Sequence, residues 1–130
     1  MDFAGRTPMH YCALNNEVLE VRRQLHDGLD PNAADSHGFT PLHFAAQEYA
    51  VDCLRELLAS GATVDARNCY GNTPLFTAVI NSRGRGEVIE LLRAHGADPL
   101  ARNQSGQTPL GLARLVANYD VARYFADVEG

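Results

Sequence analysis

Apolar residues fall at helical spacing in pairs of short segments along the chain. In the most regular pair, Leu42, Ala45 and Ala46 recur at i, i+3 and i+4, and residues 51–58 repeat that spacing with larger side chains. This periodicity places the apolar side chains of each segment on one face of a helix. Gly61 follows the second segment directly, where a residue in the left-handed conformation commonly ends a helix. The pattern predicts two short amphipathic helices, the first with small residues that allow close packing.

A GxTP motif marks the start of such a helix pair four times. The motif glycines are Gly5, Gly38, Gly71 and Gly106, so the spacings are 33, 33 and 35 residues. The threonine of each motif is suited to cap a helix, and the proline fits the first helical position, where no N–H is needed. A second glycine lies near the end of each of the first three units, at Gly28, Gly61 and Gly96. It follows the motif threonine by 21 residues in the first two units but by 23 in the third. The sequence therefore predicts two additional residues in the third unit, between its two helices and within residues 81–87.

Short polar segments join the units. Residues 32–38, 65–71 and 100–106 are rich in Asn, Asp, Ser and Gly, which close tight turns through their side chains or through positive φ. Each unit buries too little surface to be stable by itself, and stacking four of them makes a continuous core. We therefore expect a row of stacked helix pairs whose connecting turns project as hairpins.

The repeated unit resembles the ankyrin repeat, whose TPLHxA signature stands at residues 40–45. The resemblance implies an all-α fold, an ankyrin-repeat solenoid of helix-turn-helix units joined by β-hairpin-like finger loops. We expect a single domain over residues 1–130, with repeats at about 2–34, 35–67, 68–102 and 103–130. We also expect the chain to be complete, with Phe3 folded over the first helix pair. Arg114 and the polar residues 127–130 are expected to form a C-terminal cap.

Composition narrows the class of partner. A chain of 130 residues with 45% apolar content builds one core and has no room for a second domain. Sixteen acidic residues against eleven basic ones give a formal charge of −5, which disfavours nucleic acid as a partner. All eleven bases are arginine, which is typical of a GC-rich bacterial genome or, alternatively, reflects selection against lysine modification inside a host cell. No apolar run reaches the roughly 18 residues of a membrane span, so no membrane contact is predicted.

The cysteines and histidines have structural explanations that precede any catalytic one. Cys12, Cys53 and Cys69 are odd in number and lack CxxC spacing, so neither a disulfide framework nor a zinc site is indicated, and we expect a reducing, cytoplasmic setting. Cys12 and Cys53 are expected to be packed and unreactive, and Cys69 to lie in a finger. His10 and His43 occupy the fourth place of TPxH, where the resemblance implies that the ring bonds the threonine and the neighbouring turn. We predict no catalytic residue, no metal, no cofactor and no enzymatic activity.

The resemblance further implies that a partner protein binds the concave face, which finger tips and first helices form. The partner-binding residues expected there are Arg6, His37, Phe39, Glu48, Arg67, Tyr70, Asn72, Ile80, Asn81, Arg83, Arg85, Arg102, Gln104, Gln107 and Leu115. Aromatic and arginine side chains are typical of an interface centre, although Phe39 and Tyr70 would alternatively pack on adjacent fingers. Arg83 and Arg85 lie in the third unit's longer connection, which is either a flexible insertion or a partner-specific contact loop.

The function indicated is that of a protein–protein interaction module that is monomeric when alone. By its small size and arginine-only composition the chain is similar to immunity proteins, which inhibit a cognate bacterial toxin in the producing cell. A regulatory or scaffolding adaptor and a host-directed effector are the alternatives. An enzyme or small-ligand binder that uses the third-unit loop is a further hypothesis.

Overall fold

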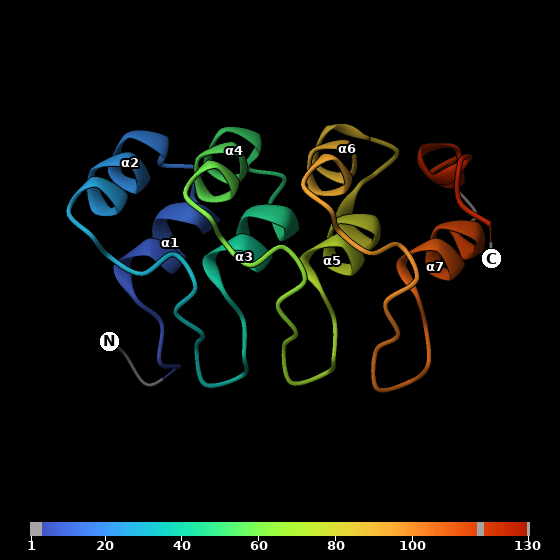
Figure 1. Cartoon of the computed structure of the whole chain (residues 1–130), viewed down its shortest axis with the longest axis horizontal. Coiled ribbons are helices and arrows are strands. Elements are labelled where there is room, and N and C mark those ends of the chain that lie inside the picture. Colours follow the sequence, from blue (N-terminus) through green and yellow to red (C-terminus); the bar gives the residue numbers. More distant parts are fainter. Residues whose placement is uncertain (1–3, 117–118, 130) are drawn as a thin grey trace.

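The computed structural model describes residues 4–116 and 119–129, and its helices form two stacked layers (Figure 1). The elements are α1 (Pro8–Leu14), α2 (Val18–His26), α3 (Pro41–Gln47), α4 (Val51–Ala59), α5 (Pro74–Asn81), α6 (Glu87–Ala94), α7 (Pro109–Leu115) and a 3-10 turn, η1 (Ala122–Phe125). One layer consists of α1, α3, α5 and α7, the other of α2, α4, α6 and η1, and the connecting loops project beyond the first layer. No β-strand occurs within the described ranges. The predicted all-α solenoid is confirmed.

The helices of the first layer begin where the GxTP motifs predict. Each starts at the motif proline, directly after a threonine in extended conformation. The Thr73 and Thr108 hydroxyl oxygens accept hydrogen bonds from the backbone N–H groups of Phe76 (3.4 Å) and Gly111 (2.9 Å). These bonds satisfy N–H groups that have no partner inside the helix.

The core lies between the two layers and continues from one helix pair to the next. Ala45, Ala46 and Ala78 are fully buried where first-layer helices meet, since α3 packs against both α1 and α5. Leu54 and Leu57 fill the space between α4 and the first layer with no exposed surface. Burial of each such leucine contributes about 1.5–3 kcal/mol. The stack is therefore held mainly by contacts between neighbouring units.

The finger loops are hairpin-like turns built around an Asp or Asn side chain, which is buried at Asp35 and Asn68 and part-buried at Asn103. In the finger at residues 65–71 the Asn68 side-chain oxygen accepts hydrogen bonds from the backbone N–H groups of Tyr70 and Asn72, both at 3.0 Å. Neighbouring fingers are joined by single backbone bonds, such as that from the Cys69 N–H to the His37 carbonyl (2.8 Å). Gly71 has φ +76°, and a Cβ there would come within 2.9 Å of the Gln104 nitrogen, so both conformation and space require glycine. These bonds give the row of fingers a fixed surface.

The structure departs from strict repetition at two places. The connection between α5 and α6 comprises residues 82–86, whereas those of the first two pairs comprise 15–17 and 48–50, which confirms the predicted insertion. In the fourth unit η1 replaces the second α-helix, with Val121 and Phe125 buried in place of a longer apolar stripe. Arg114 is exposed, as expected of a terminal unit. Phe3 lies outside the described residues.

Candidate functional site

The exposed face of the first layer presents a row of equivalent positions. Leu14, Gln47, Ile80 and Leu115 each stand seven residues after the threonine of their motif. Ile80 is 56% exposed and Leu115 is 73% exposed, whereas the leucine and glutamine of the first two units are half-buried. The C-terminal half of this row therefore consists of two apolar side chains that are exposed to solvent in the isolated chain.

The two aromatic residues predicted in the fingers differ in their surroundings. Tyr70 is 58% exposed, while its backbone is held by bonds to Asn68 and Gln104. Phe39 is half-buried and stacks on Phe44 of α3, with 5.6 Å between ring centroids and 15° between planes. The Tyr70 ring is thus an accessible aromatic group on a hydrogen-bonded backbone, whereas the Phe39 ring packs within its own repeat.

The remaining predicted finger residues divide into structural and accessible ones. Arg67 donates to the carbonyl of Arg102 (2.5 Å) and so links the bases of two fingers. The Asn72 side-chain oxygen accepts from the Asn103 amide (2.9 Å), which is a second link between the same two fingers. Arg67 is exposed despite this bond, and the other exposed predicted residues of the fingers are His37, Arg102, Gln104 and Gln107.

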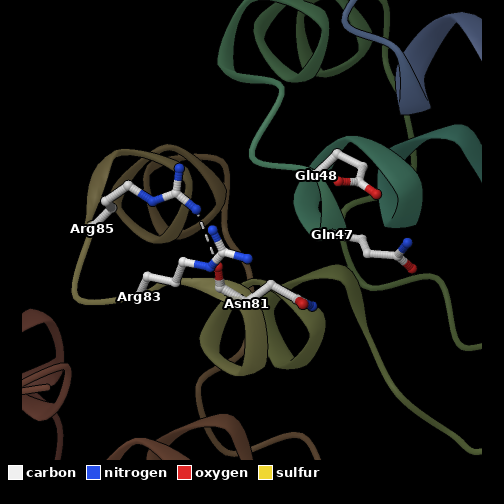
Figure 2. Close-up of a pocket in the computed structure, with 5 residues that line it drawn as sticks. All are labelled: Gln47, Glu48, Asn81, Arg83 and Arg85. Atoms are coloured by element: carbon white, nitrogen blue, oxygen red, sulfur yellow. Dashed lines mark hydrogen bonds between the residues drawn. The ribbon is translucent and has the colours of Figure 1, made fainter. Parts of the chain in front are cut away.

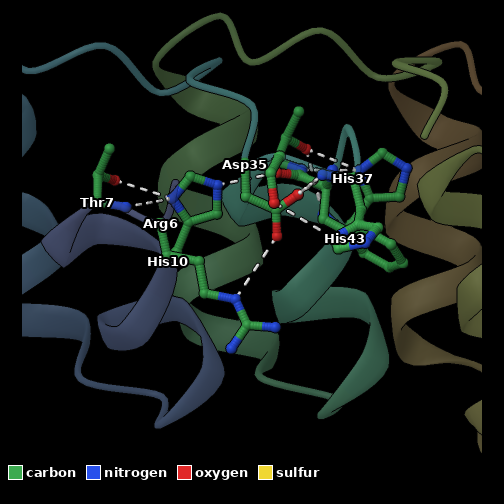
Figure 3. A network of polar contacts seen from close by, with 9 residues as sticks. Arg6, Thr7, His10, Asp35, His37 and His43 are labelled. Carbon is green, nitrogen blue, oxygen red and sulfur yellow. Dashed lines mark hydrogen bonds and ion pairs between the residues drawn. The ribbon is translucent and has the colours of Figure 1, made fainter. Parts of the chain in front are cut away.

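Arg6 is engaged within the first two units (Figure 3). Its Nε lies 3.5 Å from the Asp35 carboxylate, and its guanidinium stands over the Phe44 ring at 4.8 Å. Asp35 is itself buried, and it accepts backbone hydrogen bonds from the finger residues His37 and Phe39, both at 2.9 Å. Arg6 therefore joins the segment before α1 to the finger at residues 32–38.

Two adjoining pockets lie along this face. The first has a volume of about 260 Å³ and is lined by Arg6, Leu14, Asp35, His37, Phe39, Phe44, Gln47 and Glu48. The second, which we call the loop pocket, has a volume of about 420 Å³ and is lined by Gln47, Glu48, Asn81, Arg83 and Arg85 (Figure 2). Gln47 and Glu48 line both pockets, so the two pockets adjoin. We call them together the groove, which runs from the finger at residues 32–38 to the α5–α6 loop.

The loop pocket is positioned by a residue that the sequence did not single out. Tyr49 has φ +55° and is 8% exposed, and its hydroxyl accepts a hydrogen bond from the Val88 N–H near the start of α6 (3.3 Å). The Arg85 guanidinium lies over its ring at 3.9 Å. Burial raises the pKa of the Tyr49 phenol, so it stays neutral. The only sequence signal was an aromatic residue where the first unit has Asn16.

The predicted structural roles of histidine and cysteine are confirmed. His43 Nδ1 accepts from the Thr40 N–H (3.1 Å), and its Nε2 donates to the Asn72 carbonyl (2.9 Å). Cys12 and Cys53 are buried, and burial raises the pKa of both thiols, that of Cys53 to about 11. Cys69 is exposed, in a finger. High thiol pKa values keep the two buried cysteines unreactive at neutral pH.

The part of the chain that the structure describes has neither a metal-binding cluster nor a membrane-spanning helix. Within residues 4–116 and 119–129, no three His, Cys, Asp or Glu side chains are grouped so that they could hold a metal ion. Of the helices described, none has the length and apolar character needed to cross a membrane.

Comparison with known families agrees with this architecture. A family model described as ankyrin repeats (three copies) matches the chain twice, over residues 9–103 and over residues 50–129. Comparison with curated proteins found no match. Ankyrin repeats are in general protein–protein interaction modules and typically have no enzymatic activity. Since the two matches together span nearly the whole chain, it belongs to the ankyrin repeat family.

Proposed function

We propose that this chain binds a partner protein through the face formed by its fingers and first-layer helices. The observation that carries the proposal is the exposure of Tyr70 and Ile80 on that face, beside a groove of two adjoining pockets. Large side chains held on a rigid backbone lose little conformational entropy when a partner covers them. The finger-to-finger bonds supply such a backbone, so the surface is formed before binding.

The opposite layer is less suited to this role. Its arginines are largely paired with acids: Arg22 with Glu56 at 2.7 Å, and Arg23 with Glu20 at 2.7 Å. Such exposed ion pairs on helices contribute little to stability and present a solvated, neutralised surface. We infer that α2 and α4 face solvent while the groove contacts the partner.

The test uses two variants with matched exposed side chains. We expect Tyr70→Ala together with Ile80→Ala to weaken binding of the partner, isolated from the producing cell, at least tenfold, or about 1.4 kcal/mol. Leu19→Ala removes a side chain 73% exposed on α2 and should leave the affinity unchanged. Phe39 is not used, because its loss would disturb the stack on Phe44. Titration calorimetry measures both affinities, and equal affinities for the two variants would remove the groove face as the binding site.

Within this class we propose a monomeric, non-enzymatic inhibitor that neutralises a bacterial toxin in the cytoplasm. Support comes from the chain's small size and from its arginine-only basic composition. Titration of the isolated partner with this protein distinguishes the hypotheses. Loss of the partner's toxic activity at an equimolar ratio supports inhibition, whereas full activity in the complex favours a regulatory or scaffolding adaptor.

A further inference from the structure

The loop pocket lies where the solenoid departs from its own repeat. Arg83 and Arg85 reach it from the inserted α5–α6 connection, and Gln47 and Glu48 face them from the end of α3 (Figure 2). Two cations and one anion therefore line it, although the chain as a whole has a formal charge of −5. The pocket is a local positive point on an acidic protein.

Arg85 is held in place without being neutralised. Its Nε donates to the Ser82 carbonyl (2.9 Å), one terminal nitrogen donates to the Asn81 carbonyl (3.3 Å), and its plane lies over Tyr49. Two of the five N–H groups of a guanidinium are used in this way, and none of these partners is a carboxylate. By contrast, Arg93 on α6 forms a two-bond pair with Asp127, each bond 2.8 Å long. The charge of Arg85 remains available in a fixed orientation.

Arg83 supplies a second cation to the same pocket. Its side chain is exposed, and no hydrogen bond or ion pair joins it to another residue of the described chain. Its backbone has φ +52°, a left-handed conformation that is strained for an L-residue. Glycine would relieve that strain, so folding alone does not call for arginine here.

We propose that the loop pocket receives an acidic side chain of the partner protein, whose carboxylate is bound by Arg83 and Arg85. This inference rests on the proposed function, since the pocket lies in the groove assigned to the partner. Guanidinium groups bind carboxylates through parallel N–H bonds, and Arg85 is already oriented for them. Exposed Ile80 precedes Asn81 at the rim, so the partner's acidic residue is expected beside an apolar one.

The charge of Glu48 makes the direction of an affinity change a test of the proposal. It is exposed and lines the pocket opposite the two arginines, so it repels an incoming carboxylate. Glu48→Gln should therefore strengthen the binding of an acidic ligand. The same substitution would weaken the binding of a basic ligand, which would overturn the proposal.

The experiment uses a capped peptide of four glutamates as the probe, with a capped peptide of four glutamines as its neutral counterpart. Side-chain ¹⁵N–¹H resonances of the arginines are followed at low ionic strength. We expect the glutamate peptide alone to shift the Arg85 side-chain N–H resonances in a saturable manner. Arg83→Gly should weaken this binding at least fivefold without lowering the melting temperature. Glu48→Gln should strengthen it about threefold, while Arg55→Gln, the same loss of charge on α4, should change it by less than twofold.

Three outcomes would overturn the inference: no saturable shift, an equal response in Arg55→Gln and Arg83→Gly, or saturation by inorganic phosphate with none by the glutamate peptide. The peptide titration does not involve the natural partner. A negative result therefore removes the acidic-residue assignment and leaves the docking face to the Tyr70 and Ile80 variants. Failure of those variants alongside a positive peptide titration removes the proposed docking face instead.

Discussion

The signature histidine joins one repeat to the next through both of its ring nitrogens. In Figure 3, His10 Nδ1 accepts a hydrogen bond from the Thr7 N–H (2.9 Å), and its Nε2 bonds the carbonyl of Phe39 in the following finger (2.8 Å). Since a carbonyl only accepts, Nε2 carries the proton. His43 makes the same bonds one unit later, to Thr40 and Asn72. Each ring must remain neutral, with Nδ1 unprotonated, to make both contacts.

Protonation of His43 should therefore destabilise the fold. Burial lowers the pKa of His43 below its ordinary value of 6.5. As the pH falls below about 6.5, the unfolded chain binds a proton at His43 that the folded chain does not, so stability is lost from there down to the lowered pKa. The loss is about 1.4 kcal/mol for each pH unit in that window. Above pH 6.5 this residue contributes no pH dependence.

His43→Phe is the variant that tests this linkage, because the third unit has Phe76 at the equivalent position. We expect the variant to be less stable than the wild type at pH 7.5, since the Asn72 carbonyl loses its partner. The difference in unfolding free energy should then shrink between pH 6.5 and pH 5, as measured by urea denaturation. A constant difference across that range would show that His43 does not couple folding to pH.

At the scale of elements, the α5–α6 connection also packs against the C-terminal unit. The Tyr124 hydroxyl donates to the Gly84 carbonyl (3.1 Å), and the Tyr124 ring lies directly against Gly86. Gly86 has φ −110°, a conformation open to any residue. Glycine is required there by space alone, because a Cβ would overlap the tyrosine ring. The insertion is thus fixed on one side by Tyr49 and on the other by Tyr124.

Gly86→Ala should lower the unfolding free energy by about 1–3 kcal/mol, because the part-buried Tyr124 ring must shift to make room. Chemical denaturation measures the change. In a Tyr124→Ala background the same substitution should cost little, since the obstructing ring is gone. An equal cost in both backgrounds would mean that contact with Tyr124 is not what selects glycine.

The sequence predicted the elements better than it predicted the contacts between them. The spacing between Thr73 and the following glycine marker located the insertion. Two additional residues lengthen that spacing regardless of which side chains the insertion contacts. Its packing depends on Tyr124, 40 residues from Gly84, and on Tyr49, 39 residues before Val88. Periodicity within one unit contains no information on such pairs. For the same reason the sequence did not distinguish Phe39 from Tyr70. In the structure Phe39 stacks on Phe44, whereas Tyr70 is exposed.

At the scale of the whole molecule, each unit is stabilised by its neighbours, and among the described units the first and the last each pack against one neighbouring unit. The C-terminal cap is small: η1 buries Phe125, and Arg93 of α6 bonds the Tyr124 carbonyl (2.8 Å) as well as Asp127. The guanidinium of Arg93 holds the pKa of the Asp127 carboxyl down, at about 2. In a stack with nearest-neighbour coupling, the free energy of opening is lowest where a unit has one interface.

Removing Phe125 should consequently loosen one end of the solenoid while leaving the other intact. Phe125→Ala leaves a cavity in the cap and costs about 3–5 kcal/mol there. We expect hydrogen exchange to accelerate in α7 and α6 and to remain unchanged in α1 and α2, since α1 and α2 contact the cap only through the intervening units. Leu54→Ala, an equally buried site in the second pair, should accelerate exchange on both sides of it, because α4 packs against α2, α3 and α6. Uniform acceleration in Phe125→Ala would mean that the whole stack opens as one cooperative unit, and that the proposed partner-binding groove is as stable as the molecule itself.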